Sequence, residues 1–191
     1  MNPLRTAVKA LFLFLVALTV VLAGSTGYAQ TQEGRLVGAS PPLGALVRQY
    51  EAVTRNGATA YAIWTTDSTT AHQMWFRIAG GEALYRQRLR VYKENAGPRP
   101  ADTLPPASTL ANELLANAPT GWYALNQKRD IFTYYIDGDH RDGGSWGNDE
   151  GVRVVRARFE NGLLYQIYFE DVPQLDDYDD LIVEVALVQT P

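Results

Sequence analysis

A run of carboxylates near the C-terminus is the part of this chain whose residue types could do chemistry. Residues 170–180 read Glu-Asp-Val-Pro-Gln-Leu-Asp-Asp-Tyr-Asp-Asp, which is six carboxylates with no lysine or arginine among them. Adjacent like charges repel, so folding must either spread these acids into solvent or place a cation among them. Strand-like apolar runs lie on both sides, at 163–169 and 181–188. We favour a cation held in a loop between two strands.

Calcium is the cation that this composition suits best. It takes about six to eight oxygen ligands in irregular geometry, and carboxylates with loop carbonyls can supply them. Side chains alternate in an extended segment, so Asp177 and Asp179 are expected to point one way and Asp176 and Asp180 the other. A carboxylate from 170–171 would join from the far end of the loop. The alternative is an acidic edge that prevents sheets of different molecules from pairing.

A second acidic loop, at residues 137–144, reads Asp-Gly-Asp-His-Arg-Asp-Gly-Gly. It begins like the calcium loop of an EF-hand, but Arg141 stands at the fifth ligand position, Asp142 replaces the required glycine, and strands flank it. An EF-hand is therefore excluded. Asp137 and Asp139 are candidates for a supporting role in the same metal site, and a solvated glycine-rich turn is the alternative.

Several segments between residues 121 and 188 resemble a bacterial secreted domain family of unknown function. They are Thr-Gly-Trp-Tyr-Ala-Leu-Asn at 120–126, the Asp/Gly loop at 137–144, an Asn-Gly pair at 161–162 that is expected to form a hairpin turn, Phe-Glu-Asp-x-Pro at 169–173 and Asp-Tyr-Asp-Asp-Leu-Ile-Val at 177–183. The family is regarded as a group of calcium-binding β-modules without catalytic activity. This chain departs from it at Asp179, where the family usually has asparagine, and lacks the glycines of its acidic loop.

The resemblance implies a set of metal ligands at the end of the chain. This set is Glu170, Asp171, Asp177, Asp179 and Asp180. The residues alone do not separate Asp176 from it.

Few residues could support catalysis. The chain has no cysteine and only two histidines, His72 and His140, so catalytic triads and the usual zinc sites lack parts. A pair of carboxylates can hydrolyse a glycosidic bond. However, six acids in one loop suit a cation better than one raised and one lowered pKa. The chain is predicted not to be an enzyme, with glycoside hydrolase the least favoured function.

Four tryptophans raise a carbohydrate-binding alternative, because aromatic platforms on a sandwich can stack against sugars. Trp146 lies in the glycine-rich loop 143–147 and is expected to be the exposed one. Trp64, Trp75 and Trp122 fall within strand-like runs and are expected in the core.

The N-terminus has the pattern of a secretory signal peptide. Arg5 and Lys9 precede an apolar or small run over 10–23, and small residues at Gly27 and Ala29 mark a cleavage site. We therefore expect a signal peptide over 1–29, a flexible mature terminus over 30–42 and one domain over 43–191. An uncleaved anchor is the alternative; cleavage would leave no membrane span and a protein outside the cell, at its surface or in the periplasm.

The charge of the chain is concentrated in one place. Loss of Arg5 and Lys9 lowers the basic count from 17 to 15 against 21 acids, which gives a net charge of −6. Residues 170–184 alone contribute −7, so the rest of the chain has a net charge of about +1. A local acidic patch on an otherwise near-neutral chain argues against nucleic-acid binding. Without cysteine, a secreted domain must be stabilised by its core or by bound ions.

The apolar pattern predicts an all-β fold. Strand-like runs lie at 59–66, 74–79, 84–92, 121–126, 131–136, 152–159, 163–169 and 181–188. In the third run Arg86, Arg88 and Arg90 alternate with the residues of a second face, which indicates a solvated face on a half-buried strand, with an anion site as the alternative. That second face consists of Tyr85, Gln87, Leu89 and Val91. Asn161-Gly162 is expected to form a type I′ hairpin turn. Helical spacing predicts short helices over 43–53, where a strand pair is the alternative, and 109–117.

These patterns favour an antiparallel, jelly-roll-like β-sandwich with one or two short helices. Its predicted function is that of a secreted calcium-binding module with a structural or adhesive role. The partner is unknown and could be a polysaccharide or a surface protein.

Overall fold

The computed structural model describes residues 33–66, 69–100, 103–172 and 177–190. Within these residues the regular structure consists of thirteen strands and one short 3₁₀ helix, η1 (Ala107–Thr109). Every strand pairing is antiparallel, and the strands form two sheets. The prediction of an all-β antiparallel sandwich is confirmed.

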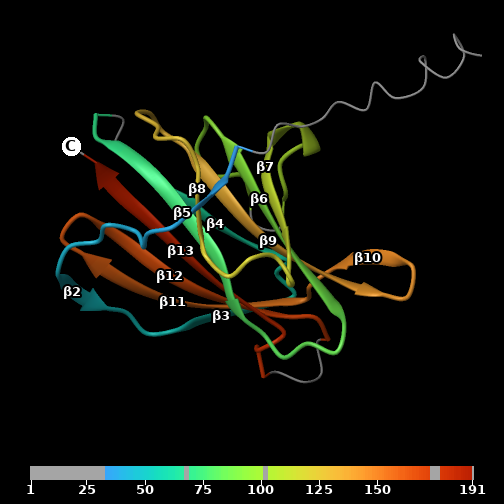
Figure 1. The fold of residues 1–191 in the computed structure, drawn as a ribbon. Coiled ribbons are helices and arrows are strands. Elements are labelled where there is room, and N and C mark those ends of the chain that lie inside the picture. The colour runs from blue at the N-terminus through green and yellow to red at the C-terminus, as the bar shows by residue number, and fades with distance from the viewer. Residues whose placement is uncertain (1–32, 67–68, 101–102, 173–176, 191) are drawn as a thin grey trace, which may run out of the picture. The chain divides into compact units, whose positions relative to one another are not determined.

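The first sheet has eight strands and carries the C-terminal part of the chain (Figure 1). Its order is β1-β8-β5-β13-β12-β11-β2, and β3 also pairs with β11. The strands are β1 (Arg35–Val37), β2 (Leu46–Gln49), β3 (Val53–Asn56), β5 (Ala71–Gly80), β8 (Trp122–Ala124), β11 (Gly151–Phe159), β12 (Gly162–Glu170) and β13 (Leu181–Thr190).

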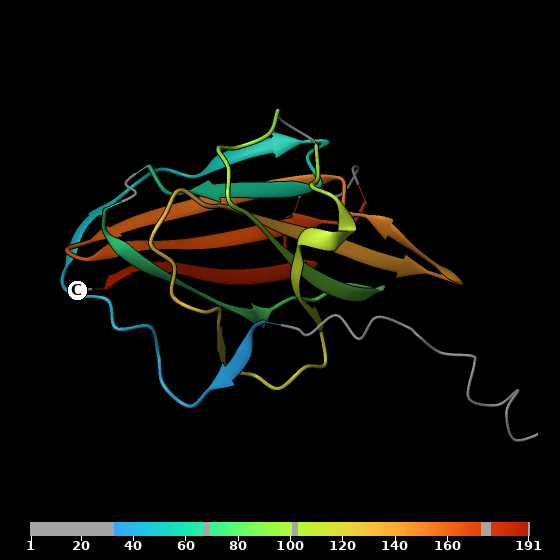
Figure 2. The ribbon, with the colours of Figure 1, turned by 90° about the horizontal axis from the view of Figure 1, so that it is seen from above.

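The second sheet has five strands: β4 (Ala60–Trp64), β6 (Arg86–Glu94), β7 (Leu110–Leu115), β9 (Thr133–Asp142) and β10 (Ser145–Asn148). Strands β4 and β10 follow one another along the same edge of β9, since β4 pairs with 133–137 and β10 with 139–142. Strand β6 pairs with the other edge of β9. The β9–β10 hairpin projects from the sandwich in both views (Figures 1 and 2).

The core lies between the sheets and follows the two-residue period of the strands. In β6, Leu89 and Val91 are fully buried, whereas Arg88 and Arg90 between and beside them face the other side of the sheet. Strands β5, β9, β12 and β13 contribute in the same way. Burial of apolar area at about 25 cal/mol per Å² is the main term that holds the two sheets together. The fully buried residues of this core include Phe76, Tyr134, Ile136, Ile167, Phe169, Leu181 and Val183.

Both predicted helices are wrong. The first falls on β2 and β3, which pair with β11, so the strand-pair alternative is confirmed. The second falls on β7, which pairs with β6. Over six to ten residues, apolar spacing does not separate a helix from a strand, and the unpaired edges of β6 and β11 decide the outcome.

The hairpin at Asn161 is confirmed, but its predicted turn type is wrong. Phe159 pairs with Gly162, so the turn residues are Glu160 and Asn161. Among the described residues, positive φ angles occur at Gly57, Gly81, Gly143 and Tyr178 and not in this turn. Gly162 is required for a different reason: a Cβ there would lie 2.4 Å from the Leu187 carbonyl oxygen.

Of the predicted N-terminal segments, the structure describes only residues from 33 onward. The predicted signal peptide lies outside the described residues. Arg35–Val37 pairs with β8, so a flexible terminus extending to residue 42 is wrong for this segment. In the described part of the chain, no helix has the length and apolarity needed to cross a bilayer.

Candidate metal centre

Three carboxylates meet where β12 ends and β13 begins. Glu170 is the last residue of β12, Asp180 directly precedes β13, and the two strands are paired up to Phe169 and Leu181. One oxygen from each of Glu170, Asp177 and Asp180 lies within 4.8 Å of the others. Glu170 and Asp180 are buried and Asp177 is exposed. This acidic triad could hold a metal ion.

Backbone amides hold the two buried carboxylates in place. The amide of Asp171 donates to Oδ2 of Asp180 at 2.8 Å. The amides of Tyr178 and Val172 donate to the two oxygens of Glu170 at 3.1 and 3.2 Å. The loop backbone therefore fixes two of the three carboxylates before any ligand arrives, which lowers the cost of ordering them on binding.

The carboxylates of the triad are crowded as well as fixed. Burial raises the pKa of Glu170 more than the amide of Tyr178 lowers it. Burial likewise raises the pKa of Asp180, against the effect of the Asp171 amide. A bound cation would reverse this by favouring the charged carboxylates.

The backbone at Tyr178 explains which acids come together. Its φ of 57° is a left-handed conformation that a bulky residue rarely adopts. This kink ends the extended alternation, so Asp177 joins Asp180, and Asp179 is not in the triad. The predicted separation of Asp177 from Asp180 is therefore wrong. Asp179 still lies beside Asp177 as predicted, because the two side chains are within hydrogen-bond reach. Asp176 lies outside the described residues.

The side chain of Tyr178 fixes the kinked loop to the sandwich. It is buried, and its hydroxyl donates to Oδ1 of Asn56 in β3 at 2.7 Å. Gly151 makes room for the ring, because a Cβ there would lie 3.0 Å from Cε1 of Tyr178. Strands β3 and β11 thus support the loop that carries Asp177.

Replacing Tyr178 with phenylalanine is expected to lower the free energy of unfolding by about 1 kcal/mol, the usual worth of one such hydrogen bond. Urea unfolding in EDTA measures it. Asn56→Ala should remove the same bond, so the double variant should lose less than the sum of the two single losses. Additive losses would contradict a role for this bond in holding the loop.

Asp171 is buried next to the triad: it is not one of the three acids whose oxygens converge, but its carboxylate interacts with that of Asp180. Its Oδ2 accepts a hydrogen bond from Nε2 of Gln87 in β6 at 2.7 Å. Burial raises the pKa of Asp171. Both its backbone amide and its carboxylate therefore contact Asp180.

A further buried acid, Asp149, was missed by the sequence reasoning. It is fully buried, its Oδ1 lies 3.1 Å from Nδ1 of His140, and its Oδ2 has no hydrogen-bond partner among the described residues. Gly138 makes this position possible, since a Cβ there would lie 2.3 Å from Oδ2. Burial, followed by the charge of Asp171, raises the pKa of Asp149 to about 8. Its sequence context, a short loop after Trp146, carries no signal of burial.

Asp137 and Asp139 do not join the triad, because arginines of β6 hold them. Arg90 lies 2.7 Å from Asp137 and 2.8 Å from Asp139, and Arg88 also binds Asp139. Both aspartates are buried. The predicted supporting role in a metal site is therefore wrong. The predicted solvated face is also wrong for Arg88 and Arg90 and holds for Arg86, which is exposed.

The tryptophans are arranged differently from the prediction. Trp146 is only partly exposed, and the guanidinium groups of Arg88 and Arg141 lie 4.3 and 6.0 Å from its ring centre. Trp75 and Trp122 are buried as expected. Trp64 is 49% exposed, contrary to the prediction, because it ends the edge strand β4.

Comparisons with known proteins leave the chain unassigned. No family model matches it, and neither a curated protein nor a solved structure matches at a significant level.

Proposed function

We propose that this protein is a secreted calcium-binding β-sandwich module with a structural or adhesive, non-catalytic role outside the cell. Glu170, Asp177 and Asp180 would be the carboxylate ligands. The observation that carries the proposal is the convergence of their oxygens within 4.8 Å at the junction of β12 and β13. Its partner would be an extracellular polysaccharide or surface protein.

The surroundings of the triad support calcium among the possible cations. The ligands are all oxygens, one of them from an exposed residue, and they come from an irregular loop between strands. Calcium tolerates such geometry, whereas magnesium demands near-octahedral coordination. The resemblance of 169–173 and 177–183 to secreted calcium-binding modules and the signal-peptide pattern support an extracellular setting, where calcium is abundant.

Calcium would act by linkage to folding. An ion bound only by the folded chain stabilises it, and at about 1 mM calcium a site with a Kd of about 10⁻⁴ M contributes about 1.4 kcal/mol. The same ion would tie the loop to the end of β12. A loop that is ordered outside the cell and loosened where calcium is scarce fits a structural role better than a catalytic one.

Thermal unfolding of the mature chain in EDTA and in 1 mM calcium tests this proposal. We expect calcium to raise the melting temperature by about 3–5 °C, as follows from that free energy for a domain of this size. Asp177→Ala should abolish the rise, because it removes the exposed ligand oxygens with little effect on packing. Asp142→Ala, which changes an exposed acid of the β9–β10 hairpin, is the matched control and should retain the rise. An equal melting temperature with and without calcium would refute the proposal.

A further inference from the structure

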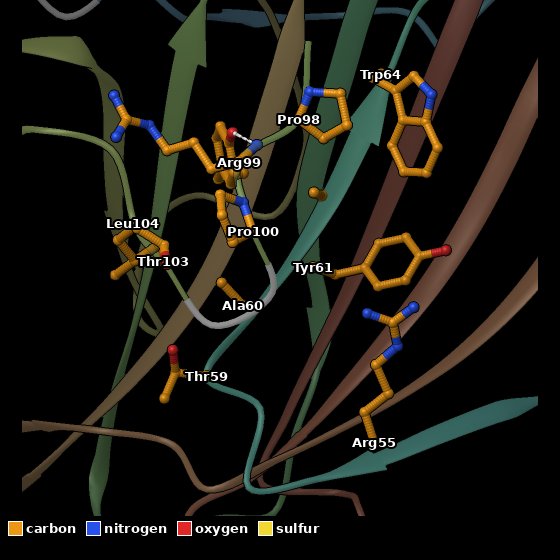
Figure 3. Close-up of a pocket in the computed structure, with 12 residues that line it drawn as sticks. Arg55, Thr59, Ala60, Tyr61, Trp64, Pro98, Arg99, Pro100, Thr103 and Leu104 are labelled. Carbon is orange, nitrogen blue, oxygen red and sulfur yellow. Dashed lines mark hydrogen bonds between the residues drawn. The ribbon is translucent and has the colours of Figure 1, made fainter.

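Away from the triad, two adjoining pockets lie at one edge of the sandwich. The first, of about 240 Å³, has Trp64, Tyr61 and Arg55 in a row on one side and residues 98–100, Thr103 and Leu104 on the other, as Figure 3 shows. The second, of about 590 Å³, is lined by Tyr61 together with Arg48, Gln49, Tyr50, Glu51, Val53, Val154 and Arg156. Since Tyr61 lines both, we call the two pockets together the edge groove.

The edge groove carries an aromatic surface that solvent can reach. Trp64 is 49% exposed, and Tyr50 and Tyr61 are partly exposed. The core does not need the Trp64 ring, which lies on the outer side of an edge strand. Flat aromatic faces of this kind pack against the apolar face of a sugar ring and keep one polar edge in water.

The same groove carries positive charge that the protein does not neutralise. Its lining includes four arginines and a single carboxylate, Glu51. Arg99 pairs with Glu94. Among the described residues, no carboxylate lies within ion-pair distance of Arg48, Arg55 or Arg156. This excess stands out on a chain whose net charge is −4.

Two of these arginines stack on one tyrosine ring, and Arg156 also shares a hydrogen bond with Tyr165. The guanidinium groups of Arg48 and Arg156 lie 4.9 and 4.1 Å from the ring centre of Tyr50. Nε of Arg156 is buried and has no hydrogen-bond partner among the described residues. Guanidinium groups stacked on a ring keep their N–H donors free at the edge, in the geometry that carboxylate and sulfate groups accept.

We propose that the edge groove binds an acidic polysaccharide. Its sugar rings would stack on Trp64 and Tyr61, and its anionic groups, uronate carboxylates or sulfate esters, would bind Arg55, Arg48 and Arg156. A nucleic acid is the less suitable occupant, because its dense phosphates call for a broad basic surface and this chain is acidic overall. No triad residue takes part, so the proposal stands independently of calcium.

Affinity electrophoresis in EDTA tests the proposal with polymers matched in backbone. The mature chain should be retarded by polygalacturonate and at least fivefold less by its methyl ester, which lacks the carboxylate charge. Trp64→Ala and Arg55→Gln should each weaken binding about fivefold or more, from the loss of one stacking or charge-assisted contact. Arg153→Gln is the matched control: Arg153 is exposed on β11 and lies outside the groove lining, so binding should not change.

Dextran sulfate and dextran form the second pair. Retardation by dextran sulfate alone would support the proposal and assign sulfate as the anionic group. Equal binding to the charged and neutral member of both pairs would overturn it, as would unchanged binding of both groove variants. Tighter binding of oligo(dT) than of either acidic polymer would overturn it in favour of a nucleic acid. Because EDTA is present throughout, failure here leaves the calcium proposal intact, and failure of calcium binding leaves the groove intact.

Discussion

Replacing Arg90 with methionine is expected to lower the free energy of unfolding at pH 8 by about 3 kcal/mol. Among the described residues, Arg90 is the one cation within ion-pair distance of both Asp137 and Asp139, whose side chains are 0% and 1% exposed. Without it, two buried carboxylates share a single remaining cation, Arg88. Removing one partner of a buried ion pair costs about 3–5 kcal/mol, because a charge is left without compensation. Methionine keeps the packing volume, and urea unfolding measures the loss.

The pH dependence of this loss tests its cause. Burial raises the pKa of Asp137 to about 7, although Arg90 opposes the shift. At pH 5 Asp137 therefore carries a proton in the folded chain, and Arg90→Met should cost clearly less than at pH 8. Arg86→Met is the matched control on the same strand: Arg86 is exposed and forms no ion pair among the described residues. An equal loss for the two variants would contradict the role of Arg90.

This network shows how the acids divide between stability and ligand binding. Asp137 and Asp139 point to the outer face of the second sheet, where cross-strand Arg90 and Arg88 stand in register with them. The triad faces an irregular loop with no arginine among its hydrogen-bond partners in the described chain. Acids with matched cations are structural, whereas the triad has a net negative charge that a bound cation would neutralise.

The strands could be predicted well because their signal is local. Alternation in β6 and the apolar runs of β12 and β13 place side chains on the correct face without knowledge of the fold. The acidic loop was likewise visible as a composition that a folded chain must neutralise. Edge elements were not predictable in this way: β2 is exposed along its whole length, so pairing with β11 rather than burial makes it a strand.

The details of the site depended on features with no local signal. The positive φ of Tyr178 is a conformation that its residue type does not predict, and it lies between Asp177 and Asp180, which the extended alternation would have placed on opposite sides. Asp149 is buried because Gly138, eleven residues earlier, leaves space above its strand. Trp64 is exposed because β4 is an edge strand. Each of these three features depends on contacts between residues far apart in the sequence, and such contacts cannot be inferred from a local pattern in one sequence.

In EDTA, the free energy of unfolding is expected to fall by about 2 kcal/mol as the pH rises from 6.5 to 8. The folded-state pKa of Asp149 is raised to about 8 and that of Asp137 to about 7, mainly by burial. Between the unfolded and folded pKa values the folded chain binds more protons than the unfolded chain. Stability then falls with rising pH by about 1.4 kcal/mol per pH unit for each proton.

The window from pH 6.5 to 8 isolates these aspartates from an opposing group. Burial lowers the pKa of His72, so its contribution rises with pH, but most of that change lies below the unfolded value of 6.5 and it fades within about one pH unit above it. Asp149→Asn should flatten the profile above pH 7 and make the chain more stable than the wild type at pH 8, since it removes a buried charge without a cation. Asp142→Asn, which alters an exposed acid, should leave the profile unchanged.

Calcium is expected to change the same pH profile of stability. The charges of Asp171 and Asp180 are among the causes that raise the pKa of Asp149. If the triad binds calcium as proposed, the cation would offset these two charges. In 1 mM calcium the free energy of unfolding should therefore fall less between pH 6.5 and 8 than it does in EDTA. Chemical denaturation at four pH values, with and without calcium, measures both effects. A wild-type profile that stays flat or rises across this window in EDTA would show that Asp149 is not held as a buried, protonated acid.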